Sequence, residues 1–210
     1  MRKVLMGIAF LWPGVLSAQE VVIAALGDSL TQGYGLVTED GFVPQLQAWL
    51  EAQGAEARLI NAGVSGDTTA GGLSRAAWTL TPEVDAMIVA LGGNDLLRGI
   101  DPSVSRSNLD GILQAASEAE VEVLLVGMQA PGNYGPDYKA AFDAIYPELA
   151  GIYDVLLAPS FFAGISAQND PAEARAYMQP DGIHPNASGV IKIVAALGPD
   201  VLDLIERAQE

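Results

Sequence analysis

Short, almost wholly apolar runs alternate with helical patterns along the chain, and this alternation limits the fold more than any other feature. The apolar runs occupy residues 21–26, 58–61, 86–91, 121–128 and 154–158. Between and after them we predict helices over residues 42–53, 69–79, about 104–118, about 137–150 and 187–207, the last capped by Asn186. The chain is therefore expected to alternate strand and helix five times.

Such alternation indicates a parallel sheet, because a crossover between parallel strands needs about a dozen residues and is usually helical. A run that is apolar throughout, such as residues 21–26, is typical of a strand covered on both faces. We therefore predict an α/β fold, with a five-stranded parallel sheet between helical layers. Two long irregular stretches, 128–136 and 160–185, are candidates for functional loops. In open parallel sheets the ligand crevice lies outside the carboxyl ends of the strands.

The first 18 residues have the pattern of a secretory signal peptide. Arg2 and Lys3 precede an apolar run over residues 4–16, and small residues near Ala18 offer a cleavage site. The run is shorter than the roughly 20 residues that a membrane-spanning helix needs. We expect cleavage after Ala18, a single domain over residues 19–210, and a periplasmic or secreted protein. An uncleaved anchor or a buried first helix is the alternative.

Composition excludes several classes of protein. Of the 210 residues, 50% are hydrophobic and 17% charged, which is typical of a globular domain rather than of a disordered chain. The formal net charge of −16 argues against nucleic-acid partners and against docking on anionic membranes. One histidine and no cysteine would leave a zinc ion with mainly oxygen ligands, so a metallohydrolase fits poorly. We expect no cofactor, no metal, no stable membrane anchor, and a monomer.

His184 is the only histidine, and it follows Asp181, Gly182 and Ile183. Imidazole is the side chain best suited to proton transfer near neutral pH. An aspartate three residues upstream can fold back on the glycine turn and accept a hydrogen bond from one ring nitrogen. The other nitrogen is then free to deprotonate a serine. A solvated surface histidine is the alternative.

The candidate nucleophile is Ser29, which follows the first predicted strand through Gly27 and Asp28. Glycine permits a tight exit from the strand, and a serine at the start of the next loop or helical turn can expose its hydroxyl. Its backbone N–H can then point at a substrate oxygen. These residue types are also common in plain turns, so this segment alone decides little.

Two more segments follow the next two strands and offer donors for an oxyanion. Gly63 has no side chain to block a ligand, so its N–H is a candidate donor. Asn94 follows a pair of glycines, and its neutral amide can hold position as charge builds. A loop glycine and an asparagine that closes its own turn are the alternatives.

Other polar residues of these segments are expected to be structural. Asp67 and Thr68 are interpreted as the start of a helix rather than as ligands. Asp95 has the residue type to compete with Asp181 for the histidine, but its adjacency to Asn94 favours a structural role.

Together and in this order, the four segments resemble the blocks of the GDSL or SGNH hydrolase family, named for the residues that are here Ser29, Gly63, Asn94 and His184. The resemblance extends from about residue 21 to the C-terminal helix. It is closest to the branch of thioesterase I, protease I and lysophospholipase L1, often called arylesterases. Further likeness lies in residues 92–99, 133–135 and 144–147.

This resemblance implies a three-layer, flavodoxin-like α/β/α sandwich and a serine esterase acting on carboxylic esters or thioesters. It implies Ser29 as nucleophile, His184 as base and Asp181 as the acid that orients it. It also implies an oxyanion hole formed by the Ser29 N–H, the Gly63 N–H and the Asn94 side chain. The expected substrates are small acyl esters, lysophospholipids or acyl thioesters.

Asn133 and Tyr134 are candidates to bind the acyl chain, because the loop 128–136 shapes the acyl site in the similar enzymes. Phe161 and Phe162 precede the histidine segment and are considered as a rim of the site. One further set of apolar residues recurs at helical spacing and is interpreted as core rather than as pocket: Tyr138, Phe142, Ile145 and Leu149.

Two alternatives remain open at this point. A carbohydrate O-acetyl esterase would share the fold and the catalytic residues, since related families remove acetyl groups from sugars. A non-catalytic binding protein could keep the fold, although the intact set of Ser29, Asp181 and His184 argues against it.

Overall fold

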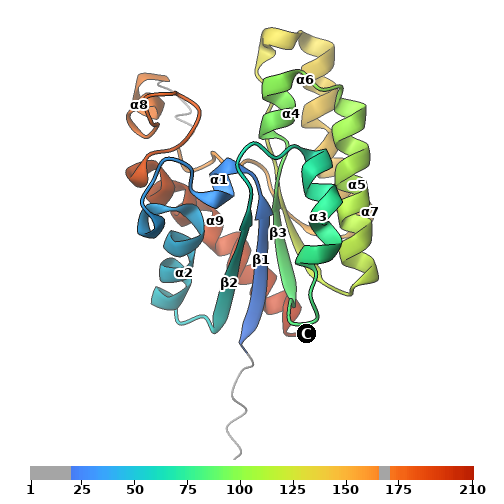
Figure 1. The fold of residues 1–210 in the computed structure, drawn as a ribbon, viewed down its shortest axis with the longest axis vertical. Coiled ribbons are helices and arrows are strands. Elements are labelled where there is room, and N and C mark those ends of the chain that lie inside the picture. The colour runs from blue at the N-terminus through green and yellow to red at the C-terminus, as the bar shows by residue number, and fades with distance from the viewer. Residues whose placement is uncertain (1–19, 166–170) are drawn as a thin grey trace, which may run out of the picture.

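The computed structural model describes residues 20–165 and 171–210, and in these residues a parallel sheet of five strands lies between layers of helices (Figure 1). The strands are β1 (Val21–Gly27), β2 (Ala57–Gly63), β3 (Ala86–Ala90), β4 (Glu122–Val126) and β5 (Leu156–Ala158). Their order across the sheet is β2-β1-β3-β4-β5, and each neighbouring pair is parallel. This order is the flavodoxin-like one, and it confirms the predicted fold class.

Helices cover both faces of the sheet (Figure 1). On one face α2 (Phe42–Ala52) packs against α9 (Ala187–Ala208); the other face carries α3 (Thr69–Thr79), α5 (Pro102–Glu118) and α7 (Ile145–Tyr153). Shorter helices lie toward the carboxyl ends of the strands: α1 (Ser29–Gln32), η1 (Thr38–Asp40), α4 (Gly93–Arg98), η2 (Gly132–Tyr134), α6 (Pro136–Asp143) and α8 (Pro171–Ala176).

The core lies on both sides of β1 and β3, whose residues are all buried. The largest fully buried side chains come from the helices as well as the sheet, and include Phe42, Phe142 and Tyr146. Burial on both faces explains why these strands are apolar at every position rather than at alternate ones.

The register of the sheet brings three strand ends together. Gly27, the last residue of β1, pairs with Gly63 at the end of β2 and with Ala90 at the end of β3. The loops that follow these three strands therefore leave the sheet at one common edge, as the sequence predicted for its candidate functional segments.

The predicted single helix over residues 137–150 is wrong in one respect: it is two helices, α6 and α7, separated at Ala144. Pro147 explains the break, because it has no N–H to donate to the Asp143 carbonyl in a continuous helix. Within α7 the proline lies in the first turn, where N–H groups need no intrahelical acceptor. The six-residue helix α4 was not predicted.

The predicted signal peptide and its cleavage after Ala18 lie outside the described residues. Of the helices in the described part of the chain, none combines the length and the apolar character needed to cross a membrane.

Candidate active site

Ser29 lies in the turn that joins the buried strand β1 to the single-turn helix α1. Gly27 has no room for a side chain, because a Cβ atom there would lie 2.7 Å from Thr31 Cβ and 3.0 Å from the Ala90 carbonyl oxygen. Asp28 caps the helix, and its Oδ1 accepts the Leu30 N–H at 3.0 Å. Ser29 is consequently the first residue of α1, where a backbone N–H has no intrahelical acceptor.

The structure brings the serine, histidine and aspartate singled out from the sequence into one chain of hydrogen bonds. His184 Nε2 lies 2.9 Å from Ser29 Oγ, and His184 Nδ1 lies 2.7 Å from Asp181 Oδ2. The serine and the histidine are 155 residues apart in the sequence. This geometry allows the imidazole to take the hydroxyl proton while the carboxylate holds the other ring nitrogen.

Asp181 also holds the backbone of its own loop. Its Oδ1 accepts the N–H groups of Ile183 at 2.9 Å and of His184 at 3.1 Å, across a glycine at residue 182 with φ of +68°. The hydrogen bond from the His184 ring, helped by these two backbone bonds, lowers the pKa of Asp181 to about 2. The carboxylate therefore stays ionised through the neutral range and can stabilise an imidazolium.

Two residues that the sequence did not single out, Gln179 and Tyr34, also hold the histidine. The Gln179 N–H donates to the His184 carbonyl at 2.7 Å, and Gln179 Nε2 donates to the carbonyls of Tyr34 at 2.8 Å and Pro185 at 3.0 Å. The Tyr34 and His184 rings pack with their centroids 4.6 Å apart. The only sequence signal for Tyr34 was an aromatic residue between two glycines in a loop at the active edge of the sheet.

Gly63 is placed differently from the oxyanion donor that the resemblance implies. It is still part of β2, which extends two residues past the predicted end, and its N–H donates to Asn61 Oδ1 at 3.0 Å. It needs to be glycine because a Cβ atom there would lie 2.8 Å from Gln32 Cα. The structure does not bring Gly63 to the wall of the cleft described below.

Gly66, three residues further on, does line the cleft. It lies in a turn closed by the Asp67 N–H bond to the Val64 carbonyl at 3.1 Å, and its φ of +84° favours glycine. Within the described residues, no protein acceptor takes the N–H of Gly66 or that of Ser29. Both groups are therefore available to a substrate oxygen.

Asn94, on α4, lines the same cleft, and its side-chain amide is held in place. Its Nδ2 donates to the Asp67 carbonyl at 2.9 Å and, more weakly, to Asp28 Oδ2 at 3.3 Å. The longer bond is the one that a substrate oxygen can replace at the lower cost.

Asp28 is a buried carboxyl directly before Ser29. Burial raises its pKa to about 6, although the hydrogen bond from the Leu30 N–H and the nearby His184 act in the opposite direction. Its Oδ2 also lies close to Gly93, where a Cβ atom would be 3.2 Å away. Asp28 therefore keeps its proton to a higher pH than an exposed aspartate does, directly beside Ser29.

The remaining acids of these segments are structural, as predicted. Asp95 is fully buried, and its two oxygens accept bonds from the Thr69 N–H, the Thr69 hydroxyl and the Ser105 hydroxyl at 2.6–2.9 Å. Thr68 caps α3 by accepting the Gly71 N–H. This confirms Thr68 as a helix start and Asp95 as a residue that joins α3, α4 and α5.

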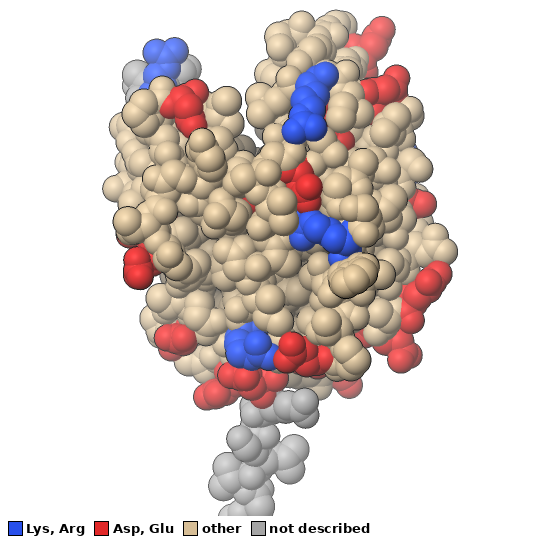
Figure 2. Space-filling view, viewed as in Figure 1, with Lys and Arg blue, Asp and Glu red and all other residues tan. Residues whose placement is uncertain are grey.

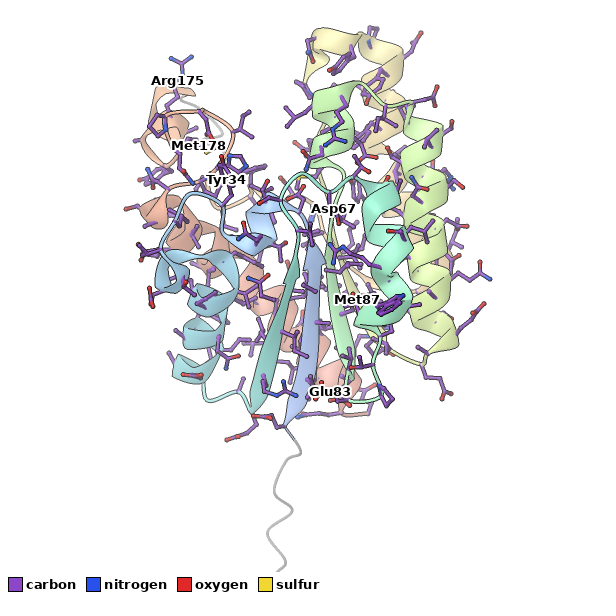
Figure 3. All side chains as sticks on the ribbon, in the orientation of Figure 1. Tyr34, Asp67, Glu83, Met87, Arg175 and Met178 are labelled. Atoms are coloured by element: carbon purple, nitrogen blue, oxygen red, sulfur yellow. The ribbon has the colours of Figure 1, made fainter. Side chains whose placement is uncertain are left out.

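These groups open onto a cleft of about 910 Å³ between two walls of the molecule. Figure 2 shows the hollow at the carboxyl edge of the sheet, and Figure 3 shows Tyr34 and Met178 on the α8 side and Asp67 across from them, beside α3. Asn133 and Tyr134 line the cleft where they were expected, joined by Leu97 and Ile183. Most of the surface that lines it is apolar.

The two phenylalanines divide between cleft and core. Phe162 lines the cleft, whereas Phe161 is buried against Phe42 with ring centroids 5.1 Å apart. The helical stripe is core, as interpreted from the sequence: Phe142, Ile145 and Leu149 are buried, and Tyr138 is partly buried with its hydroxyl donating to Ile100.

The cleft differs in charge from the rest of the surface. The chain has 26 Asp and Glu, but of the described residues that line the cleft only Asp28 is acidic, and Arg175 also lines it. In Figure 2, basic side chains lie on both walls near the mouth; an acidic one lies below the basic one on the left-hand wall, and others are spread along the right flank and the lower edge. In the described part of the chain, no three His, Asp or Glu side chains form a group that could hold a metal ion.

Comparison with known proteins gives concordant matches. Residues 25–190 match the model of the GDSL-like lipase/acylhydrolase family. The chain is 37% identical over 190 residues to Esterase TesA of Pseudomonas aeruginosa, covering 90% of each chain, and 38% identical over 162 residues to thioesterase 1/protease 1/lysophospholipase L1 of Escherichia coli K12, covering 77% of this chain and 74% of that one. Among solved structures, the SGNH-hydrolase family esterase AlinE4 superposes with a TM-score of 0.72 at 43% identity, covering 89% of this chain and 97% of that one.

Proposed function

The chain belongs to the GDSL-like lipase/acylhydrolase family, and from that premise we propose that it is a serine esterase that hydrolyses carboxylic esters or thioesters. The observation that carries this proposal is the chain of hydrogen bonds from Ser29 Oγ through the His184 ring to Asp181, at 2.9 and 2.7 Å. These groups open onto an apolar cleft at the carboxyl edge of the sheet.

In the proposed reaction, Ser29 Oγ attacks the acyl carbon and its proton moves to His184 Nε2. Asp181, ionised because its pKa is lowered to about 2 by the hydrogen bond from the His184 ring, stabilises the imidazolium. The tetrahedral intermediate collapses as His184 protonates the departing alcohol or thiol, and the acyl group remains on Ser29. Water then attacks the acyl-enzyme, with His184 again as base, and releases the carboxylic acid.

Three groups are proposed to hold the oxyanion: the Ser29 N–H, the Asn94 amide and one backbone N–H from the turn after β2. For that last donor we favour Gly66 over Gly63, because Gly66 lines the cleft and its N–H has no acceptor among the described residues, while the N–H of Gly63 is bonded to Asn61. Neutral donors aimed at the developing charge are worth about 3–4 kcal/mol each in comparable enzymes.

The cleft favours substrates with an acyl chain. Leu97, Met128, Tyr134, Met178 and Ile183 give it apolar walls well beyond the size that an acetyl group needs. Aryl esters, lysophospholipids and acyl thioesters are therefore the proposed substrates, with Asn133 and Tyr134 at the acyl wall. A carbohydrate O-acetyl esterase binds only an acetyl group on the acyl side and does not need such extended apolar walls.

The location of the protein follows from its N-terminus. Residues 1–18 are proposed to be a signal peptide and residues 19–210 a single exported domain, periplasmic or secreted. Removing Arg2 and Lys3 makes the formal charge −18, so neither nucleic acid nor an anionic membrane is a fitting partner. The mature domain is proposed to act as a monomer.

Covalent labelling tests this function. An organophosphonate should label the protein once, at Ser29, as measured by intact-protein and peptide mass spectrometry. Ser29→Ala should abolish the labelling, whereas Ser65→Ala, at a second serine in the cleft wall, should not. A p-nitrophenyl ester series should show higher kcat/KM for longer acyl groups than for acetyl. Absence of labelling in the folded wild-type protein would overturn the proposal.

A further inference from the structure

Arg75, on α3, makes three hydrogen bonds that join the loops around the proposed oxyanion hole. Its Nη1 donates to the Ala62 carbonyl at 2.6 Å, its Nη2 to the Gly27 carbonyl at 2.8 Å, and its Nε to Asp67 Oδ2 at 2.7 Å. The arginine side chain is 22% exposed and that of Asp67 19%. One partly buried guanidinium therefore binds two backbone carbonyls and one carboxylate.

Each of these points is close in sequence to a proposed oxyanion donor. Gly27 ends β1, two residues before Ser29. Asp67 directly follows Gly66, and its own carbonyl accepts the Asn94 amide at 2.9 Å. Ser29, Gly66 and Asn94 thus follow three different strands; Arg75 bonds the segments of the first two directly, and the third is joined through the Asp67 carbonyl.

Arginine is suited to this task by its chemistry. Its guanidinium is a rigid planar fork with five N–H donors, and it stays charged at any pH that the fold survives. Bonds from a charged donor are shorter and stronger than neutral ones. Lysine, a point charge on a flexible stem, cannot span the same three acceptors.

We propose that Arg75 is a positioning residue for acyl transfer, which fixes the Ser29 N–H, the Gly66 N–H and the Asn94 amide relative to one another without touching the substrate. Arg75 does not line the cleft, so it acts through the loops alone. The inference rests on the proposed oxyanion hole. Since that hole binds the transition state and not the ground state, loss of Arg75 should lower kcat and leave KM nearly unchanged.

The experiment compares Arg75→Gln and Arg75→Lys with the wild-type protein. A displacement of about 1 Å in a catalytic group typically costs about 100-fold in rate, so we expect Arg75→Gln to lower kcat about 100-fold. Arg75→Lys keeps the charge and can satisfy some of the three acceptors. Its kcat should therefore lie between those of the wild-type protein and of Arg75→Gln. The matched control is Arg106→Gln, at an arginine that pairs with Glu148 at 2.6 Å on the distant surface of α5 and α7; it should leave kcat unchanged.

Two further measurements separate positioning from general stability. Rates are divided by the fraction of sites that an organophosphonate titrates, so that misfolded protein does not count. Affinity for an alkyl boronic acid, which mimics the tetrahedral intermediate on Ser29, should fall in proportion to kcat/KM. A role confined to stability would lower the melting temperature and the titrated fraction but not the turnover of each titrated site.

A second variant, Asp67→Asn, tests the inference even if Arg75→Gln does not fold. Asp67→Asn weakens the ion pair but keeps the carbonyl that holds Asn94, so kcat should fall by a smaller factor in the same direction. Turnover of titrated Arg75→Gln and Asp67→Asn sites within about threefold of wild type would overturn the inference while leaving the esterase assignment intact. Failure of the wild-type protein to hydrolyse any ester would instead overturn the proposed function.

Discussion

The two halves of the proposed catalytic site are held in different ways. The serine half, with Ser29 and Asn94, follows the ends of β1 and β3. Buried side chains hold it in place, among them Asp28 at 1% and Asp95 at 0% exposure. In the histidine half the Asp181 side chain is 38% exposed. Its bonds are mostly local, within residues 177–186, and Gln179 links it to the loop after α1 through the Tyr34 carbonyl.

This difference matches what each half has to do. Donors that stabilise a developing charge act best when they are already in place and shielded from water. A proton carrier needs the correct orientation but also access to the leaving group and to water. Exposed segments with few buried contacts open more readily than buried ones, so we expect the histidine half to be the less stable of the two.

The largest effect should come from breaking the hydrogen-bond chain that joins the halves. We expect His184→Ala and Ser29→Ala each to lower kcat by about 10⁴-fold or more, with the melting temperature nearly unchanged. The double variant should be no slower than the worse single one, because the residues act as a unit. Single-turnover kinetics measure this, and additive losses would mean that the two residues work separately.

A smaller effect, on stability, should come from the buried half. Asp95→Ala leaves the Thr69 N–H and the hydroxyls of Thr69 and Ser105 without their acceptor, so the free energy of unfolding should fall by about 3 kcal/mol or more. Asp101→Ala is the control, since Asp101 is an exposed cap of α5; its loss should lower the free energy of unfolding much less. Urea unfolding measures the free energy of unfolding of both variants. Equal losses would contradict the expected difference between a buried and an exposed carboxylate.

Asp28 should give a stability change of opposite sign. Burial raises its pKa from 3.8 to about 6, so the folded protein binds this proton more tightly than the unfolded chain. The ionised carboxylate therefore destabilises the fold above pH 6, and this loss disappears as the pH falls toward 4. We expect Asp28→Asn to raise the free energy of unfolding by about 3 kcal/mol at pH 8 and by much less at pH 4.5, while lowering activity. A gain independent of pH would rule out the buried charge as its source.

The smallest effect should come from the link between the halves. Gln179→Ala removes the bonds to the carbonyls of Tyr34 and Pro185, so the imidazole loses part of its orientation. We expect kcat/KM to fall about tenfold, equivalent to about 1.4 kcal/mol, with little change in melting temperature. Gln114→Ala is the control, because Gln114 bonds only Glu118 on the exposed face of α5. Equal activity of the two variants would show that the histidine loop needs no such link.

The sequence predicted well those parts of the fold in which burial or helix capping requires the same structure as the local residue preference. β1 is apolar at each buried position, and Asn186 caps α9 by accepting the Gly189 N–H at 3.0 Å, as predicted. The bounds of α3 were predicted to the residue. In each case burial or capping and local residue preference agree.

The site could be predicted only as far as residue type and order allow. His184 was singled out because it is the only imidazole in the chain, Asp181 because it lies three residues before it, and Ser29 because it follows the first strand through Gly27 and Asp28. Gly63 was singled out as the donor, but nothing in the local sequence says whether β2 ends before or after residue 63, because strand ends are set by pairing with β1. The positions of Tyr34 and Gln179 depend on contacts between distant loops, for which a single sequence carries no signal.

The hydrogen bond between His184 Nδ1 and Asp181 Oδ2, at 2.7 Å, has a practical consequence because the chain has no second imidazole. A short bond of this kind moves the shared proton to an unusually low-field resonance. In a protein labelled with ¹⁵N, every imidazole signal must come from this one ring. The protonation of His184, the proposed general base, could then be followed by magnetic resonance through pH, inhibitor binding and turnover, without any assignment of the spectrum.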